Sequence, residues 1–339
     1  MRVKAMRDGG KSWAEVGSEM GMVPEQCRNR FKRWRKRPAP DIIDVRFPDK
    51  VNPDAITLDD IKAAYSDARQ VRDKSNISQS VASVNLPDEK PVAISFISDM
   101  HIGSPFVDYE ALFADIEAIR DTPGFYCCMG GDGYDNFLPG FKDAGAVAGQ
   151  LQPPQIQLLT YEKILEELGD KLVGIVGGNH NEKVSKATGV SPEHFVYRGV
   201  KCPYLRQGGL LRVNLGGVEY QILWKHNYRF GSSLNQFNSH HRMLEMLYPM
   251  ADIVVTEHEH NPGIETVERF DLGAARTVVS IRTGSYKGAD PYSMSYFKAG
   301  RRGPQTVLLW PGPRRILPIH GADAIEHAKT YMRGLYGSS

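Results

Sequence analysis

The sequence is poor in cysteine and has no long hydrophobic run. Its 339 residues include four cysteines, and none of them has the spacing of a zinc site. Cys127 and Cys128 are adjacent inside an apolar run, which predicts two small buried residues. No apolar run approaches the roughly 18 to 20 residues that span a bilayer. The first 13 residues carry charge without the apolar core of a secretory signal. We therefore expect a reduced, cytoplasmic setting and no membrane partner.

What the sequence does have is an uneven distribution of charge. Residues 1–37 hold 11 Lys or Arg against 4 Asp or Glu, a net charge of +7. The remaining residues hold 31 basic and 36 acidic side chains, a net charge of −5, so the whole chain stands at +2. One end of the chain is therefore suited to a polyanion, and the bulk of the chain is not.

The basic segment itself predicts two helices joined by a tight turn. Ser12 and Glu15 form a capping box, Gly21 ends the first helix, and Pro24 suits the first turn of the second. This pattern resembles the helix-turn-helix class, whose second helix enters the major groove of DNA. The alternative is a basic helical hairpin that docks on protein or keeps the chain soluble. The candidate nucleic-acid-binding residues are Arg28, Arg30, Lys32, Arg33 and Arg35.

The pattern of the chain changes at residue 91. Before it, residues 1–37 form a small all-α module, and residues 38–90 are predicted to be a linker with one helix that begins near Thr57 and a polar loop over 75–90. From residue 91 to 320, apolar strands run repeatedly into Gly, Asp, His or Asn and alternate with helix-like segments. This predicts an α/β domain with polar residues at the strand ends, where binding sites form. Residues 321–339 are predicted to be a C-terminal tail.

Histidines and acids gather at these predicted strand ends. His258 and His260 follow one apolar run, and alternation along a strand would point both imidazoles to the same face. Neutral imidazoles are common metal ligands, although a surface pair beside a Pro-Gly turn is the simpler alternative. Taken in order, the strand ends supply Asp99, His101, Asp132, Asn179, His180, His226, His258 and His260.

This ordered set resembles the calcineurin-like metallophosphoesterase superfamily. The family pattern is D-x-H, G-D-x-x-D, G-N-H-[D/E], a lone H and G-H-x-H, and the match covers about residues 91–320. The resemblance implies a sandwich of two β-sheets flanked by helices. It also implies two divalent metal ions, with Mn²⁺ favoured and Fe or Zn as alternatives. The implied ligands are Asp99, His101, Asp132 and His260 for one ion, and Asp132, Asn179, His226 and His258 for the other.

The same resemblance implies a reaction. Two divalent ions can clamp the attacking and leaving oxygens of a displacement at phosphorus, with Asp132 as the shared ligand and a bridging hydroxide as the nucleophile. His180 would stabilise charge or donate a proton at the leaving oxygen, and Asp135 would hold its imidazole. Two positions depart from the pattern. Asn181 stands where the family has an acid, which leaves His180 more dependent on Asp135. Glu257 stands where the family has Gly, and its side chain should alter the loop or the contacts behind the ligands.

Two further loops offer groups that could contact a substrate. The segment after His226 and the segment 282–288 contain hydroxyl and cationic side chains suited to phosphate oxygens. The alternatives are an ordinary surface turn with a helix cap in the first and a stretch that closes the core sheets in the second. The candidate substrate-binding residues are Arg229, Ser232, Ser233 and Tyr286.

The implied chemistry suits phosphodiesters and phosphomonoesters alike. The basic N-terminal segment favours nucleic acid, and DNA in particular, because phosphate contacts dominate such binding. The first hypothesis is therefore a phosphodiesterase or nuclease, suited to a bacterial or bacteriophage enzyme, for which the family also implies a possible homodimer. The second is a phosphomonoesterase for nucleotides, small phosphoesters or phosphoproteins. The third is a DNA-binding regulatory protein whose metal site is not catalytic.

Overall fold

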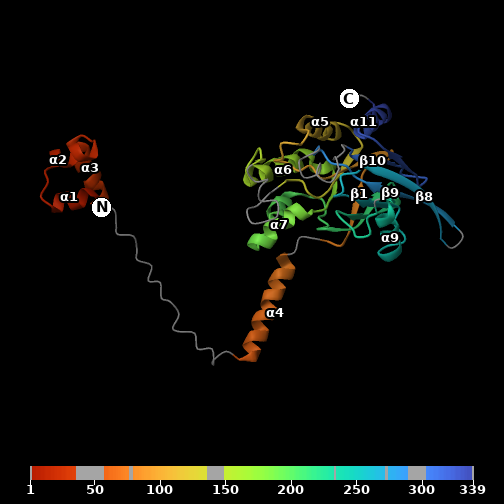
Figure 1. Ribbon diagram of the computed structural model, residues 1–339, viewed down its shortest axis with the longest axis horizontal. Helices are drawn as coiled ribbons and strands as arrows, with labels where there is room; N and C mark the ends of the chain where they lie inside the picture. The colour runs from red at the N-terminus through yellow and green to blue at the C-terminus, as the bar shows by residue number, and fades with distance from the viewer. Residues whose placement is uncertain are drawn as a thin grey trace. The chain divides into compact units, whose positions relative to one another are not determined.

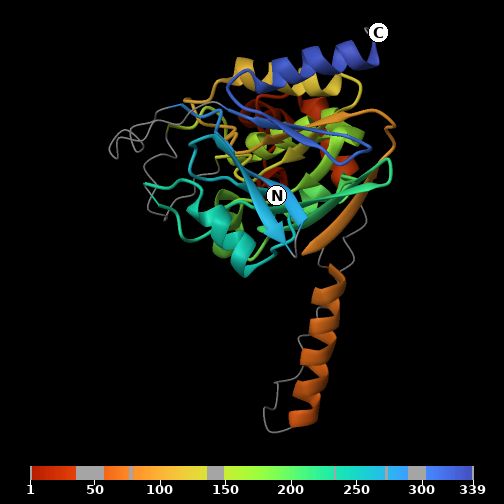
Figure 2. The same ribbon diagram turned by 90° about the vertical axis from the view of Figure 1, so that its right-hand side faces the viewer.

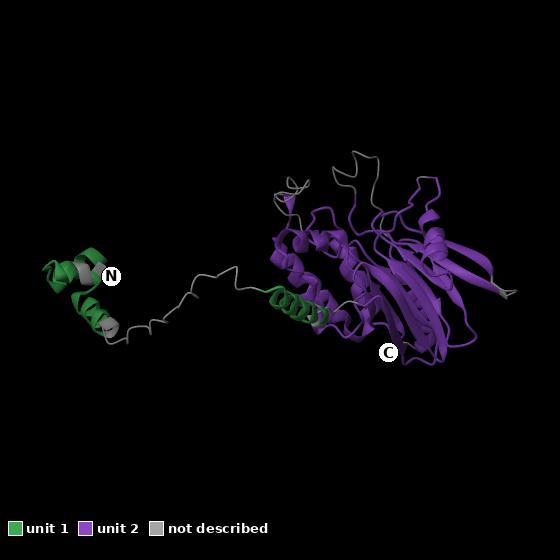
Figure 3. Cartoon of the chain, turned by 90° about the horizontal axis from the view of Figure 1, so that it is seen from below, with its two compact units in different colours: residues 1–74 green, residues 75–339 purple. Residues whose placement is uncertain are grey.

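The structure is a computed structural model, and it divides into two compact units, residues 1–74 and 75–339 (Figure 3). The predicted linker at 38–56 and the candidate residue Ser233 lie outside the described residues. No helix among the residues described is long and apolar enough to cross a membrane. The described residues are 2–35, 57–75, 79–135, 149–232, 234–271, 274–288 and 303–337.

The N-terminal unit contains the two predicted helices. The Ser12 hydroxyl accepts from the Glu15 amide at 3.3 Å, and the Ser12 amide donates to the Glu15 carboxylate at 2.6 Å, so the capping box is confirmed. Gly21 ends the first helix in the left-handed conformation at φ 61°, and Pro24 begins the next. A further helix precedes them that the sequence pattern did not predict. The helices are α1 (Arg2–Asp8), α2 (Trp13–Met20), α3 (Pro24–Arg35) and α4 (Leu58–Ser75).

Helices α2 and α3 pack through a small apolar contact. Val16 and Cys27 are buried, and the rings of Trp13 and Phe31 lie 5.6 Å apart. The helix-turn-helix function of this module stays a prediction. Its candidate residues all lie on α3. Arg28, Arg30 and Lys32 are exposed, and Arg33 and Arg35 belong to the last turn of the helix.

The second unit is built on two β-sheets. The five-stranded sheet has the order β11-β10-β2-β3-β4, and its strands β2, β3 and β4 run parallel. The six-stranded sheet has the order β1-β5-β6-β7-β9-β8, with β6, β7 and β9 parallel. The strands are β1 (Val81–Leu86), β2 (Val92–Ile97), β3 (Phe125–Met129), β4 (Leu172–Ile175), β5 (Gly208–Leu215), β6 (Val218–Lys225), β7 (Ile253–Thr256), β8 (Gly263–Asp271), β9 (Ala274–Arg282), β10 (Gln305–Leu309) and β11 (Ile316–Ile319).

Helices cover the outer faces of both sheets (Figure 1). Helices α5, α6 and α11 bury their apolar faces against the five-stranded sheet, and α11 lies along α5 (Figure 2). Helix α9 packs on the outer face of the six-stranded sheet through Met243 and Leu244. The helices are α5 (Tyr109–Arg120), α6 (Pro154–Leu168), α7 (Asn179–Thr188), α8 (Glu193–Val196), α9 (Asn238–Met246) and α11 (Ala324–Tyr336), with short 3-10 turns η3 (Gly169–Lys171) and η4 (Tyr197–Gly199).

The main core lies between the two sheets. Strand β2 is buried along its whole length because the second sheet covers one face and helices cover the other, which explains its unbroken apolar sequence. On the inner face, Phe96 of β2 meets Trp224 of β6 edge to face, with ring centroids 6.2 Å apart. The predicted fold class, two sheets flanked by helices with a small all-α module before them, is confirmed.

Two predicted boundaries need correction. The loop predicted over 75–90 contains strand β1, in which Ala82, Val84 and Leu86 alternate with more exposed residues and pack against the inter-sheet core. The second unit therefore begins at Ser75, before the predicted position of 91. The predicted C-terminal tail contains α11, an amphipathic helix that buries a full apolar face.

We predict that Phe96→Ala lowers the free energy of unfolding by about 3 to 5 kcal/mol, because it opens a cavity between two sheets that cannot collapse onto it. Urea unfolding followed by far-ultraviolet circular dichroism measures the loss. Phe270→Ala is the matched control, since that ring is 78% exposed on β8. Equal stability of the two variants would contradict a core centred on Phe96.

Candidate metal centre

The polar residues that follow five parallel strands meet at one edge of the sandwich. Strands β2, β3 and β4 of one sheet lead into Asp99, Asp132 and Asn179, and strands β6 and β7 of the other lead into His226 and His258. Because parallel strands end at the same edge of a sheet, stacking two such sheets brings both sets of side chains together.

The backbone at these positions is strained. Five of the seven non-glycine residues with positive φ in the described part of the chain belong to this group. Such conformations cost on the order of 1–3 kcal/mol each and persist only where the surroundings impose them. The expected strand alternation does not explain the pair of histidines, because β7 ends at Thr256 and both lie beyond it. The left-handed turns aim the side chains instead; they occur at Asp99 (φ 50°), His101 (49°), Asp132 (53°), His258 (72°) and His260 (51°).

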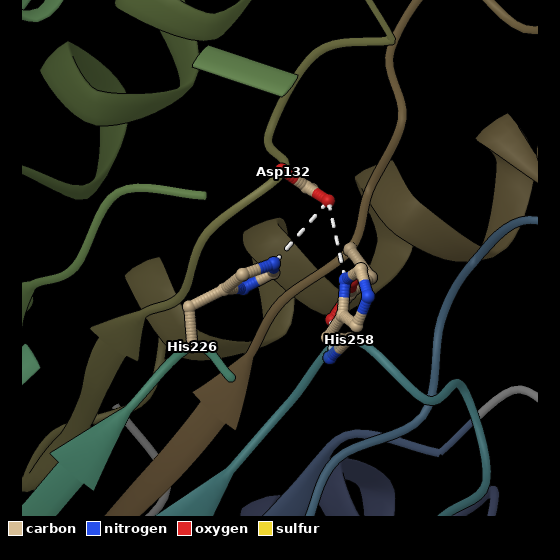
Figure 4. Close-up of side chains that lie close together, drawn as sticks. Asp132, His226 and His258 are labelled. Atoms are coloured by element: carbon tan, nitrogen blue, oxygen red, sulfur yellow. Dashed lines mark hydrogen bonds and ion pairs between the residues drawn. The ribbon is translucent and has the colours of Figure 1, made fainter. Parts of the chain in front are cut away.

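One group of potential ligands surrounds Asp132 (Figure 4). Asp132 Oδ2 lies 3.3 Å from His226 Nε2 and 4.0 Å from His258 Nδ1. The side-chain oxygen of Asn179 lies 3.1 Å from the same nitrogen of His226. With Asp99, these carboxylates and imidazoles place ligand atoms within 4.8 Å of one another, close enough to hold one metal ion.

A second group surrounds Asp99. His260 Nε2 lies 3.1 Å from Asp99 Oδ1 and 3.2 Å from His101 Nε2. Asp99 thus takes part in both groups, whereas the family resemblance gives the shared position to Asp132. The structure brings all seven predicted ligands together and places His258 and His260 in different groups, as expected. That Asp132 bridges two ions stays a prediction.

The electrostatics of the cluster depend on pairing between buried acids and imidazoles. Asp99 and Asp132 are fully buried. Burial acts to raise the pKa of Asp99, but His260 and His226 hold it below its usual range. Burial acts to lower the pKa of His226, but Asp132 and Glu257 raise it above its usual value. The cluster combines buried carboxylates, an amide oxygen and imidazoles that can lose a proton. This set of oxygen and nitrogen donors fits Mn, Fe or Zn.

Asp135 contacts different partners from those predicted. Its carboxylate lies 2.8 Å from His101 Nδ1 and 3.5 Å from Lys287 Nζ, but 3.9 Å from His180. His180 Nδ1 instead donates to the main-chain oxygen of Asp135. Burial lowers the pKa of His101 to about 4, so its ring is neutral and Nδ1–H donates to Asp135. Asp135 therefore orients both histidines, one through its side chain and one through its backbone.

Glu257 is the functional residue whose partners the sequence did not reveal. Its buried carboxylate accepts three hydrogen bonds, from Trp224 Nε1 at 2.6 Å, Gly131 N at 2.8 Å and His226 Nδ1 at 2.9 Å. A Cβ on Gly130 would lie 2.3 Å from its Oε1, so the carboxylate occupies space that only glycine leaves open. By accepting from Nδ1, Glu257 presents His226 Nε2 to the cluster. The signal was the departure from Gly at this position.

Two predicted substrate residues are engaged elsewhere. The hydroxyl of Ser232 accepts from the amides of Leu234 at 3.3 Å and Asn235 at 3.2 Å, so it caps its own turn, as the structural alternative expected. Tyr286 is buried, and its hydroxyl donates to the Asp115 carboxylate at 2.7 Å. Tyr286 therefore helps to close the fold, as the structural alternative expected.

Arg229 remains a candidate because its side chain is exposed. Its guanidinium carbon lies 4.9 Å from the ring centre of Phe230, within cation–π range. Arg229 follows His226 by three residues along the chain.

Comparison with known proteins gives likenesses of fold alone. No protein family and no curated protein matches the sequence. Among solved structures, the chain is similar to zinc-complexed Vps29 of Entamoeba histolytica, with 12% identity over 68% of this chain and 99% of the other and a TM-score of 0.32. It is also similar to the nuclease MPE of Pseudomonas putida (13%, 66% and 86%, TM-score 0.28) and to a phosphatase of Mycoplasma pneumoniae (11%, 69% and 95%, TM-score 0.34).

We predict that Glu257→Gln weakens Mn²⁺ binding by about 10- to 100-fold. All three partners of Glu257 are N–H donors, and the amide of Gln would turn a donor toward one of them. Isothermal titration with Mn²⁺ measures the affinity, and unfolding curves check that the fold is kept. Glu268→Gln, at an exposed position on β8, is the control. Unchanged Mn²⁺ affinity in Glu257→Gln would show that His226 needs no such support.

We also predict that metal binding expels protons. In the metal-free chain, the pKa values of His226 and His260 lie above the usual value. Burial acts to lower them, but the neighbouring carboxylates, Asp132 for His226 and Asp99 for His260, outweigh it. A metal ion needs the same nitrogens deprotonated, so Mn²⁺ affinity should fall as the pH drops from about 8 to about 6. Titrations in buffers of different ionisation enthalpy should show release of about one proton or more. Zero proton release would contradict this charge pattern.

Proposed function

We propose that the protein is a metal-dependent phosphoester hydrolase that acts on phosphodiesters, with nucleic acid as its substrate. The observation that carries the proposal is the cluster at the strand ends, where two buried carboxylates, an amide oxygen and four imidazoles converge from two sheets. A purely structural polar network would not require strained backbone at five of these positions.

Asp99, His101, Asp132, Asn179, His226, His258 and His260 would hold two divalent ions in this proposal. When bound, such ions supply Lewis-acid stabilisation of phosphoryl oxygens and lower the pKa of water. Mn²⁺ suits the mixture of oxygen and nitrogen ligands, with Fe or Zn as alternatives. Residues behind the ligands set their direction, since Glu257 fixes His226 and Asp135 fixes His101.

His180 is the candidate proton donor to the leaving oxygen. Its backbone amide donates to Asp132 Oδ1 at 2.8 Å, which places its side chain at the edge of the cluster. Because Nδ1 donates to the carbonyl of Asp135, Nε2 is the nitrogen that can exchange a proton. A histidine held in one tautomer beside a phosphorus centre is suited to general acid catalysis.

The N-terminal module supports nucleic acid, and DNA first, as the substrate. Arg28, Arg30 and Lys32 are exposed on α3, within a segment of net charge +7. Exposed cations on one helix suit contacts to a phosphate backbone. A tethered binding module would raise the concentration of substrate near the cluster. A tethered binding module favours a polymeric substrate over a small phosphomonoester. It also favours a catalytic role for the cluster over the hypothesis of a regulatory protein with a non-catalytic metal site.

We predict that the wild-type protein hydrolyses bis-(p-nitrophenyl) phosphate in the presence of Mn²⁺ faster than the matching monoester, and that Asp132→Ala lowers turnover to background. Asp132 touches both His226 and His258, so its loss opens the cluster. Asp121→Ala, at an exposed position after α5, is the control. Faster monoester turnover with DNA left intact would favour the phosphatase. Retained turnover in Asp132→Ala would overturn the proposal.

We further predict that Arg28→Ala, Arg30→Ala and Lys32→Ala together weaken DNA binding and lower the slope of log affinity against log salt by about 3. Turnover of bis-(p-nitrophenyl) phosphate should be unchanged, because that ester needs no backbone contact. Replacing three exposed lysines elsewhere is the matched control, namely Lys163, Lys186 and Lys201. An unaltered salt slope would assign DNA binding to another surface.

A further inference from the structure

The loop that joins β6 to α9 exposes an aromatic ring in a strained conformation. Phe230 is 40% exposed and has φ 75°, a region that bulky residues rarely adopt. The side-chain amide of Asn238, in the first turn of α9, donates to the Phe230 carbonyl at 2.8 Å. The Ser232 hydroxyl ties the following turn. The loop is therefore built to hold this ring outward, since strain of this kind persists only where the surroundings impose it.

Two arginines flank the exposed ring. The guanidinium carbon of Arg229 lies 4.9 Å from the ring centroid, and that of Arg242 on α9 lies 6.0 Å away. Arg242 also donates to Glu245 at 3.1 Å. Tyr228 adds a second ring at 6.1 Å. A partly exposed aromatic ring beside two cations offers apolar contact and charge together, which is the combination that single-stranded nucleic acid needs.

This platform lies close to the metal cluster. Phe230 is four positions after His226, so their Cα atoms are at most about 14 Å apart. That distance is on the order of four base steps along the axis of B-form DNA, that is, a few nucleotides. A base stacked on Phe230 would therefore belong to a nucleotide near the phosphate that reaches the cluster.

We propose that Phe230, with Arg229 and Arg242, forms a nucleotide subsite in which the ring stacks on a base of a single strand and the arginines face its phosphates. The proposal rests on the proposed function for the role of the subsite in turnover, but not for binding itself. In this proposal, the loop after β6 distinguishes a nucleotide diester from a simple phosphodiester. Arg229 faces the phosphates beside the stacked base.

Two esters with the same leaving group test the subsite. Thymidine 5′-(p-nitrophenyl phosphate) carries a thymidine where methyl p-nitrophenyl phosphate carries a methyl group. Their ratio of kcat/KM therefore reports the contribution of the nucleoside. Phe230→Ala should lower this ratio roughly five- to 150-fold, the range expected for one stacked base. Phe230→Trp should restore it, because the larger ring stacks at least as well. Phe270→Ala, at an exposed ring on β8, should leave it unchanged.

A binding measurement separates failure of the subsite from failure of the proposed function. Isothermal titration of the Mn²⁺-loaded protein with thymidine 5′-monophosphate should show the same loss in Phe230→Ala, while affinity for inorganic phosphate should stay constant. If neither ester is hydrolysed but the nucleotide affinity depends on Phe230, the subsite stands and the hydrolase proposal falls. If esters are hydrolysed but neither the ratio nor the nucleotide affinity changes in Phe230→Ala, the subsite is overturned.

Discussion

The burial of two carboxylates at the edge of a two-sheet sandwich is the constraint on which the rest of the site depends. Asp99 and Asp132 are fully buried, and a buried charge is tolerated only where it is paired or binds a metal. Their partners are imidazoles from the opposite sheet, chiefly His226 and His260. Neither sheet alone could supply both halves of this pairing. The two sheets therefore have to keep a fixed position relative to each other at this edge, and the core around Phe96 holds them there.

Glu257 extends the same constraint behind the ligands. Its carboxylate accepts from Gly131 after β3 of one sheet and from Trp224 and His226 of the other, so a single buried charge joins both sheets. The ring of Trp224 packs in the inter-sheet core while its N–H belongs to this network. Packing and ligand orientation are thus carried by the same side chains, and a change in one is expected to alter the other.

The sequence predicted the cluster well because its signal is local. Each predicted ligand follows an apolar strand within four residues. The ends of parallel strands meet at one edge of a sheet, so this can be expected without knowing the loop conformations. The strand β1 was missed although its alternation of Ala82, Val84 and Leu86 is a period-two signal, because the polar residues between them resembled a loop. The contacts of Asp135 and Tyr286 could not be predicted, since which donor lies nearest is decided by tertiary geometry.

The strand ends and the connecting loops contribute different side chains to the site, and under the proposed function this bears on substrate recognition. The five strand ends carry the predicted ligands and the residues that orient them, so under the proposed function they offer little that could distinguish one phosphoester from another. Recognition then falls to the connecting segments, where most hydroxyl groups already serve their own turns, as Ser232 does. Side chains that project outward are the ones left for substrate. After β6 the exposed side chains include Arg229 and Phe230, and the backbone of Phe230 is strained.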